Sequence, residues 1–167
     1  VVDLSPEMLA LDRQAAAAKS VAIRIVPASM DDMSSLAEAS FDIVVQPVST
    51  CYVPDLAAVY RAVARVTASN GIYVSHHKQP ASLQAEAAAT TQVCVLAEPY
   101  YRTGPLPAAP EGSWHREHGT IEFLHRWEQL LGGLCRAGFV LEDVAEPRHA
   151  DPLAPSGSFA HRSTYVP

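Results

Sequence analysis

The stretch FDIVVQPVSTCYVPDLAAVYRAVARVTASNGIYVS, residues 41–75, contains the clearest structural pattern in this 167-residue sequence. Its first six residues, 41–46, form an apolar run rich in β-branched side chains, which is typical of a strand buried on both faces of a parallel sheet. Residues 72–75 have the same character. A helical pattern lies between the two runs, so the stretch predicts a strand, a crossover helix and a second strand.

The helix of this unit is predicted to begin after Pro54-Asp55 and to end at Asn70-Gly71, which are residue types common at the two ends of helices. Four apolar residues between these limits share one stripe at helical spacing. They are Leu56, Val59, Val63 and Val66. A helix of this kind buries its stripe against a sheet.

The first forty residues repeat the same order. Val1 and Val2 are predicted to end a strand, and Ser5-Pro6-Glu7 supplies an N-cap, a proline at the first helical position and an acid near the helix N-terminus. This helix is expected to run to about Ala18, and a short strand is expected over residues 22–26. Alternating strands and helices predict the α/β class with a mostly parallel sheet.

The second half of the chain has a weaker pattern. Residues 76–118 are irregular apart from one added strand expected within TQVCVLAEP, residues 91–99. A helix is predicted to start at Thr120 and to end at Gly138, with an apolar face made of Ile121, Leu124, Trp127, Leu131 and Leu134. Two further strands are expected, one over residues 139–144 and one beginning within residues 158–167.

Composition narrows the classes of partner. A net charge of −6 argues against binding nucleic acid through bulk electrostatics, so a small-molecule substrate is expected. No apolar run approaches the roughly 20 residues that span a bilayer, and the N-terminus has no signal-peptide pattern. We therefore expect a cytoplasmic protein that does not bind a membrane. Its three cysteines, Cys51, Cys94 and Cys135, are expected to be free thiols.

Four strand ends are candidates for ligand binding, because ligands of open α/β sheets bind beyond the carboxyl ends of the strands. The first predicted strand ends in Asp3, whose carboxylate could accept hydrogen bonds from both hydroxyls of a ribose. The second leads to residues 28–31, the third ends in Gln46-Pro47 and the fourth in Ser75-His76-His77. This set of residues suits a ligand that contains a nucleoside.

The order and spacing of these segments resemble a known family. VVDLSPEML, then PASMDD, then FDIVVQPVSTCYVPDL, and finally a helix ending in NG before IYVS are similar to the middle of a class I S-adenosylmethionine-dependent methyltransferase of the small-molecule type. The resemblance implies a Rossmann-like fold with helices on both faces of the sheet. It also implies S-adenosylmethionine as cofactor and methyl transfer to a small-molecule acceptor.

The resemblance also implies roles for individual residues. Asp3 would hold the ribose of the methyl donor, and Leu4 would pack near the adenine. The adenine edge would be met by Ser29, Met30 and Asp31. Gln46 and Pro47 would line the methionine part of the donor and the methyl-transfer mouth.

Each of these roles has a structural alternative. Asp3 could simply help to cap the following helix, and one of Asp31 and Asp32 could serve only the local hydrogen bonds of a turn. Gln46 could do no more than end its strand. The sequence leaves these alternatives open.

One feature of the family is missing. Its members carry a glycine-rich loop between a first strand and a first helix, just upstream of a segment like Val1–Leu9, and no such loop occurs here. We therefore expect one incomplete methyltransferase domain over residues 1–167, with the first strand and helix upstream. Residues 78–118 are expected to form an irregular substrate or lid insertion. Candidate acceptor contacts within it are Tyr100, Tyr101, Arg102 and His115, with Trp114 and Arg116 nearby.

The histidines suggest a base rather than a metal site. His76 and His77 follow the fourth strand, where either could act as a general base or contact the substrate. Adjacent residues on an extended segment point to opposite sides, and no pair with ligand spacing occurs elsewhere, so no metal is expected. Two other functions remain open: a nicotinamide-dependent oxidoreductase, whose ribose would also suit Asp3, and a non-catalytic methyltransferase-like module.

Overall fold

The computed structural model describes residues 1–87, 94–109, 111, 116–155, 158–164 and 166. It divides into two compact units. Unit 1 comprises Val1–Val45 and Ala57–Val74, and unit 2 comprises Gln46–Leu56 and Ser75–Pro167.

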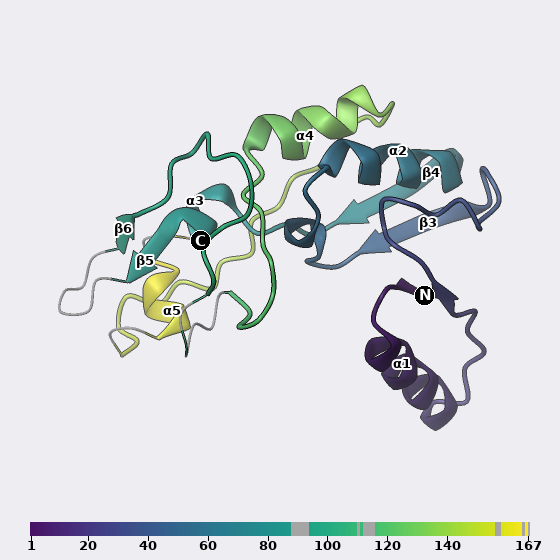
Figure 1. Ribbon diagram of the computed structural model, residues 1–167, viewed down its shortest axis with the longest axis horizontal. Coiled ribbons are helices and arrows are strands. Elements are labelled where there is room, and N and C mark those ends of the chain that lie inside the picture. Colours follow the sequence, from purple (N-terminus) through teal and green to yellow (C-terminus); the bar gives the residue numbers. More distant parts are fainter. Residues whose placement is uncertain (88–93, 110, 112–115, 156–157, 165, 167) are drawn as a thin grey trace. The chain divides into compact units, whose positions relative to one another are not determined.

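Unit 1 begins with a strand, a helix and a second strand (Figure 1). Strand β1 (Val2–Asp3) pairs in parallel with β2 (Val26–Pro27), with Val2 opposite Val26. Helix α1 (Pro6–Ala18) starts where the sequence predicts, because the Ser5 hydroxyl accepts a hydrogen bond from the Met8 N–H at 3.2 Å. Of the strand predicted over residues 22–26, only Val26 lies in β2. Strand β1 is two residues long and therefore pairs with two residues of β2.

The second half of unit 1 confirms the strand–helix–strand prediction. Strand β3 (Phe41–Gln46) pairs with β4 (Thr67–Ser75), and helix α2 (Leu56–Val66) connects them. The two strands run in the same direction (Figure 1): the Ser40 N–H donates to the Val66 carbonyl at their start, and the His76 N–H donates to the Gln46 carbonyl at their end. All four residues of the predicted stripe on α2 are buried.

Two expectations about this pair of strands are wrong. Helix α2 ends at Val66, and Asn70-Gly71 lies inside β4, where Asn70 has a φ of 62°. Strand β3 is also not buried on both faces among the described residues, because Phe41, Ile43 and Val45 are exposed. Alternate residues of a strand share a face, so one face of β3 is left open.

Gly71 is required by the close approach of the backbone around it. An added Cβ would lie 2.8 Å from Thr67 Cγ2, 2.9 Å from the Ala68 carbonyl oxygen and 3.0 Å from the Asp42 carbonyl oxygen. We expect Gly71→Ala to lower the free energy of unfolding by about 2 kcal/mol, because these neighbours are mostly backbone and cannot move aside cheaply. Urea denaturation measures this loss.

A matched control exists in a helix of unit 2. A Cβ on Gly132 would meet only the end of the flexible Arg136 side chain, at 3.1 Å. Gly132→Ala should therefore be neutral, or stabilising by up to about 1 kcal/mol, because alanine favours the helix. Equal stabilities for the two variants would contradict the proposed crowding at Gly71.

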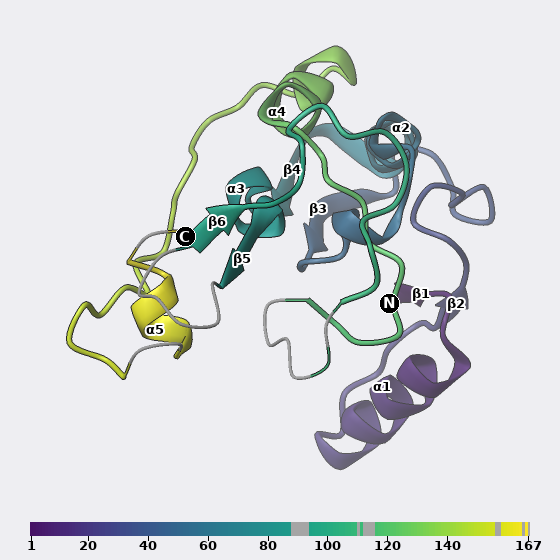
Figure 2. The same ribbon diagram turned by 60° about the vertical axis from the view of Figure 1, so that its left-hand side comes forward.

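Unit 2 contains the remaining elements. They are the 3-10 helix η1 (Thr50–Tyr52), α3 (Pro80–Gln84), β5 (Ala85–Ala87), β6 (Cys94–Leu96), α4 (Trp127–Arg136) and α5 (Phe159–Arg162). Strands β5 and β6 pair antiparallel and lie side by side in Figure 2. This confirms an added strand within residues 91–99. No helix in the described part of the chain is long and apolar enough to cross a membrane.

Three predictions for the C-terminal half are wrong. Helix α4 begins at Trp127 instead of Thr120, because residues 121–126 are extended and the Phe123 N–H donates to the Cys51 carbonyl at 2.7 Å. Residues 139–144 form no strand with any described segment, and residues 159–162 form helix α5, capped by Ser158, instead of a strand. The end of α4 is as predicted, since Gly138 has a φ of 97°.

Candidate functional site

The carboxyl edge of the β1–β2 pair brings together the residues predicted to bind a nucleoside. Because the strands are parallel, Asp3 and the turn after β2 lie at the same edge, and the Ala28 N–H donates to the Asp3 carbonyl at 3.1 Å. The Asp3 Oδ1 atom accepts from the Ser5 N–H at 2.8 Å. Among the described residues no partner is recorded for Oδ2, so Asp3 helps the start of α1 and keeps one oxygen for a ligand.

The two aspartates of the turn after β2 have different surroundings. The Ser29 hydroxyl is hydrogen-bonded to Asp31 Oδ1, and both residues are half-buried with Met30. Asp32 is exposed, and its Oδ1 accepts from the Ser34 N–H at 3.1 Å. Hydrogen bonds from Ser34 lower the pKa of the Asp32 carboxyl. Asp32 thus stabilises the turn, which leaves Asp31 as the ligand candidate.

Leu4 follows Asp3 at the same edge. Its side chain is 68% exposed and is therefore accessible to a ligand. Unit 1 therefore brings Asp3, Leu4, Ser29, Met30 and Asp31 to one edge.

Gln46 and Pro47 lie in unit 2, where β3 ends. Gln46 is buried, and its Nε2 donates to the Ser49 hydroxyl at 3.1 Å. That hydroxyl in turn donates to the Pro47 carbonyl at 3.0 Å. The Gln46 side chain therefore shapes the loop that follows β3 as well as ending the strand.

His76 and His77 point to different environments. His76 is exposed, whereas the His77 ring is hydrogen-bonded through Nδ1 to the Thr50 hydroxyl at 2.9 Å and through Nε2 to the Ser75 hydroxyl at 2.8 Å. Burial, with smaller contributions from His76 and His125, lowers the pKa of His77 to about 4. The neutral ring carries one proton, so it donates to one hydroxyl and accepts from the other.

His125 is a buried histidine in the extended segment before α4. Its Nε2 lies 3.0 Å from the Thr50 carbonyl oxygen and 2.9 Å from the Val53 carbonyl oxygen. Both partners are acceptors, so Nε2 carries a proton and ties η1 to the segment before α4. In the described part of the chain, no group of three or more His, Cys, Asp or Glu residues could hold a metal ion.

The candidate acceptor contacts of the irregular region do not form one set. Tyr100 and Tyr101 pack edge to face with ring centroids 5.3 Å apart, and the Arg126 guanidinium lies 5.2 Å from the Tyr101 ring centroid. Arg102 instead closes its own loop, through Glu98 at 2.6 Å and the Pro105 carbonyl at 2.9 Å. Trp114 and His115 lie outside the described residues.

Comparison with known proteins found similarity to methyltransferases. A family model described as "Methyltransferase domain" matches residues 1–75. The chain is 28% identical over 151 residues to the protein named "Uncharacterized methyltransferase YbaJ" of Bacillus subtilis (strain 168), which covers 89% of this chain and 59% of that protein.

Solved structures agree as well. An S-adenosylmethionine-dependent methyltransferase from Mesorhizobium loti is 25% identical, with a TM-score of 0.65 over 85% of this chain and 63% of the other. Residues 1–75 are thus similar to a methyltransferase domain, and most of the chain is similar in sequence and fold to an S-adenosylmethionine-dependent methyltransferase. A structure titled as a putative S-adenosylmethionine-dependent methyltransferase from Listeria monocytogenes, at 14% identity, shares the fold with a TM-score of 0.65, covering 88% of this chain and 68% of that one.

The chain spans 59% of the length of the curated relative it matches. The span matched by the family model ends at the last residue of β4. It therefore contains the edge with Asp3 and Asp31, and stops short of the irregular region and of α4.

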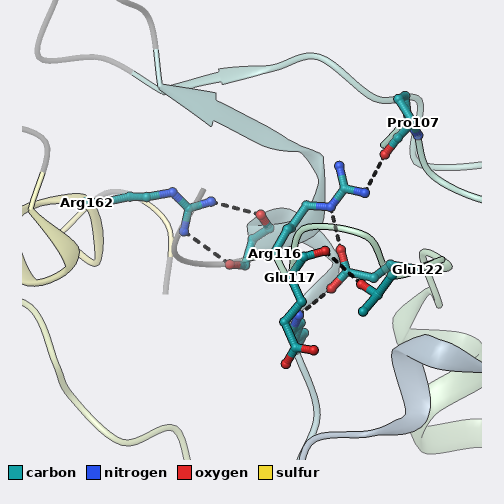
Figure 3. A network of polar contacts seen from close by, with 8 residues as sticks. Pro107, Arg116, Glu117, Glu122 and Arg162 are labelled. Carbon is teal, nitrogen blue, oxygen red and sulfur yellow. Dashed lines mark hydrogen bonds and ion pairs between the residues drawn. The ribbon is translucent and has the colours of Figure 1, made fainter. Parts of the chain in front are cut away.

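Sequence analysis missed a buried charge cluster in unit 2 (Figure 3). Glu122 is 0% exposed; its Oε1 accepts from Lys78 Nζ at 2.5 Å and its Oε2 from Arg116 Nε at 2.6 Å. The signal was period-two alternation: in an extended segment Glu122 and Leu124 share the inward face, and both are buried while Ile121 is exposed. The apolar residues of this segment also fit helical spacing, so a helix was predicted instead of an extended segment.

Proposed function

We propose that the protein transfers a methyl group from S-adenosylmethionine to a small-molecule acceptor. The observation that carries the proposal is the position of the Asp3 carboxylate, at the carboxyl edge of two parallel strands and inside the span that matches the family model. A carboxylate at that edge suits the two hydroxyls of a ribose. The acidic net charge of −6 favours a small acceptor over nucleic acid.

The residues at this edge fit the donor. Asp3 Oδ2 would accept the ribose hydroxyls while Oδ1 keeps its bond to the Ser5 N–H. Exposed Leu4 would cover one side of the adenine, and the turn with Met30 and Asp31 would meet its polar edge. Gln46 and Pro47 would line the methionine part.

In methyl transfer from S-adenosylmethionine, the protein does not have to activate the leaving group. The donor, when bound, supplies an activated methyl group on a sulfonium, so the protein contributes orientation and exclusion of water. We assign the acceptor contact after β4 to exposed His76. His77 has both ring nitrogens hydrogen-bonded and a pKa of about 4, which makes it a weak base and suits a role in holding the loop after β3.

The test is calorimetric titration of S-adenosylhomocysteine into the full-length protein and its Asp3→Asn variant. Asparagine keeps an oxygen for the Ser5 N–H and removes the charge that strengthens the ribose hydrogen bonds. We expect binding to weaken about 10- to 100-fold, which is the size of one or two charged hydrogen bonds.

Asp42→Asn is the matched control, because Asp42 is exposed at the opposite end of β3 and should leave affinity unchanged. NADH serves as a second ligand. Equal affinity of the wild-type protein and Asp3→Asn would contradict the ribose assignment. Binding of NADH alone would favour a nicotinamide-dependent oxidoreductase in place of the proposed function. If neither ligand binds, a non-catalytic module would be favoured.

A further inference from the structure

The charge cluster around Glu122 contains two cations, Lys78 and Arg116, and one fully buried carboxylate (Figure 3). Arg116 is 6% exposed and is held by Glu122 and by the Pro107 carbonyl at 2.5 Å. One buried carboxylate thus serves two cations. Two nearby acidic groups do not compensate, since burial raises the pKa of the Cys51 thiol to about 11 and also raises that of the Tyr52 hydroxyl, keeping both neutral.

Glu117 is the other acid near the cluster. It is exposed to solvent, and its carboxylate is hydrogen-bonded by the Tyr52 hydroxyl. Solvent screens an exposed carboxylate, so its charge compensates the two cations of the cluster only weakly. A ligand that brings a negative charge to this place would therefore be stabilised.

Lys78 is the member of the cluster that a ligand can reach. It follows β4 by three residues, at the carboxyl end where ligands of this fold class bind. Its side chain is 18% exposed, and its Nζ lies 5.7 Å from the centroid of the Tyr52 ring. The ammonium has three donors, and among the described residues one carboxylate, Glu122, accepts from it.

We propose that Lys78, held in place by Glu122 and lying over the Tyr52 ring, binds an anionic oxygen group of the methyl acceptor. This inference rests on the proposed methyltransferase function and specifies its substrate class: an organic acid or a phosphate ester. The Tyr52 ring beside the ammonium offers an apolar surface to the carbon skeleton that carries the anion.

Three related probes test this in the full-length protein: benzoate, phenyl phosphate and the uncharged benzamide. Binding is followed by two-dimensional NMR titration of the protein. We expect at least one anion to bind about tenfold more tightly than benzamide, which is the size of one charged hydrogen bond. Comparing the affinities of benzoate and phenyl phosphate shows whether the site prefers a carboxylate or a phosphate.

Substitutions at Lys78 isolate its charge. Lys78→Gln keeps an N–H donor for Glu122 Oε1 and leaves the neutral Arg116–Glu122 pair, so the fold should persist. We expect it to bring the anions to within about twofold of benzamide, whereas Lys78→Arg should keep the preference. Lys19→Gln, a surface change at the end of α1, should behave like the wild-type protein.

Three outcomes would overturn the inference: no anion binding by the folded wild-type protein, equal binding of benzamide and the anions, or an unchanged preference in Lys78→Gln. Titration of S-adenosylhomocysteine into the same samples separates the two proposals. Donor binding without anion preference rejects the acceptor site alone. Anion preference without donor binding rejects the methyltransferase function and leaves the anion site standing.

Discussion

Glu122→Gln is expected to lower the free energy of unfolding by about 3–5 kcal/mol, which is the usual loss when one partner of a buried ion pair is removed. The wild-type carboxylate is fully buried and accepts from Lys78 and Arg116, one on each oxygen. A glutamine amide offers one oxygen and one NH2 group, so it would turn a donor toward one of the two cations. Arg116 would remain buried without a charged partner. Urea denaturation at pH 7 measures the loss.

Glu128→Gln is the matched control for this change. Glu128 pairs with Arg126 and Arg136, but its side chain is 62% exposed. Surface ion pairs of this kind contribute about 0–1 kcal/mol, so the control should stay close to the wild-type protein. A loss below about 1 kcal/mol for Glu122→Gln would show that the cluster relaxes around a neutral side chain, and would weaken the picture of a rigid support for Lys78.

Acid should destabilise the protein through His77. Its pKa is about 4 in the folded state and 6.5 in the unfolded chain, so the unfolded state binds the proton more readily. The contribution to stability is therefore fully present above about pH 6.5 and is lost as the pH falls toward 4. With allowance for partial solvent screening, we expect a loss of about 2–3 kcal/mol by pH 4.

His77→Gln isolates this effect. Glutamine can still donate to one hydroxyl and accept from the other, at Thr50 and Ser75, but it does not titrate. Its free energy of unfolding should fall by about 2–3 kcal/mol less than that of the wild-type protein between pH 7 and pH 4. Other titrating groups, including His125 with its lowered pKa, are common to both proteins and cancel in the difference.

An exposed histidine gives the control for this experiment. His118→Gln should keep the acid sensitivity of the wild-type protein. Parallel curves for the wild-type protein and His77→Gln would show that protonation of His77 does not oppose folding. The hydrogen bonds of the ring would then have to rearrange at low cost.

The elements of residues 1–75 were predictable because their signals are local. Ser5 and Pro6 start α1 through a side-chain cap and a preset φ, and the stripe on α2 follows from helical spacing alone. The family resemblance came from the same local segments. It also pointed to the edge that carries Asp3 and the turn with Asp31, because parallel neighbours place their carboxyl ends together.

Prediction failed where a segment depends on a partner distant in sequence. Residues 121–126 have helical spacing, yet the Phe123 N–H bonds to the Cys51 carbonyl and the Leu106 N–H to the Glu122 carbonyl. These contacts hold the segment extended and delay α4 to Trp127. Asn70-Gly71 led to a wrong prediction of where α2 ends. A positive φ is typical of a helix end, but at Asn70 it occurs within strand β4.

The amino-acid sequence by itself determined the fold class, the caps and stripes of the N-terminal helices and the strand ends that carry polar residues. Each of these depends on neighbours a few positions apart, whose geometry is set by the backbone period. Only the tertiary structure decided the state of the buried polar groups. Glu122 meets Lys78 across 44 residues and His77 meets Thr50 across 27, and no pattern between near neighbours in the sequence predicts hydrogen bonds over such separations.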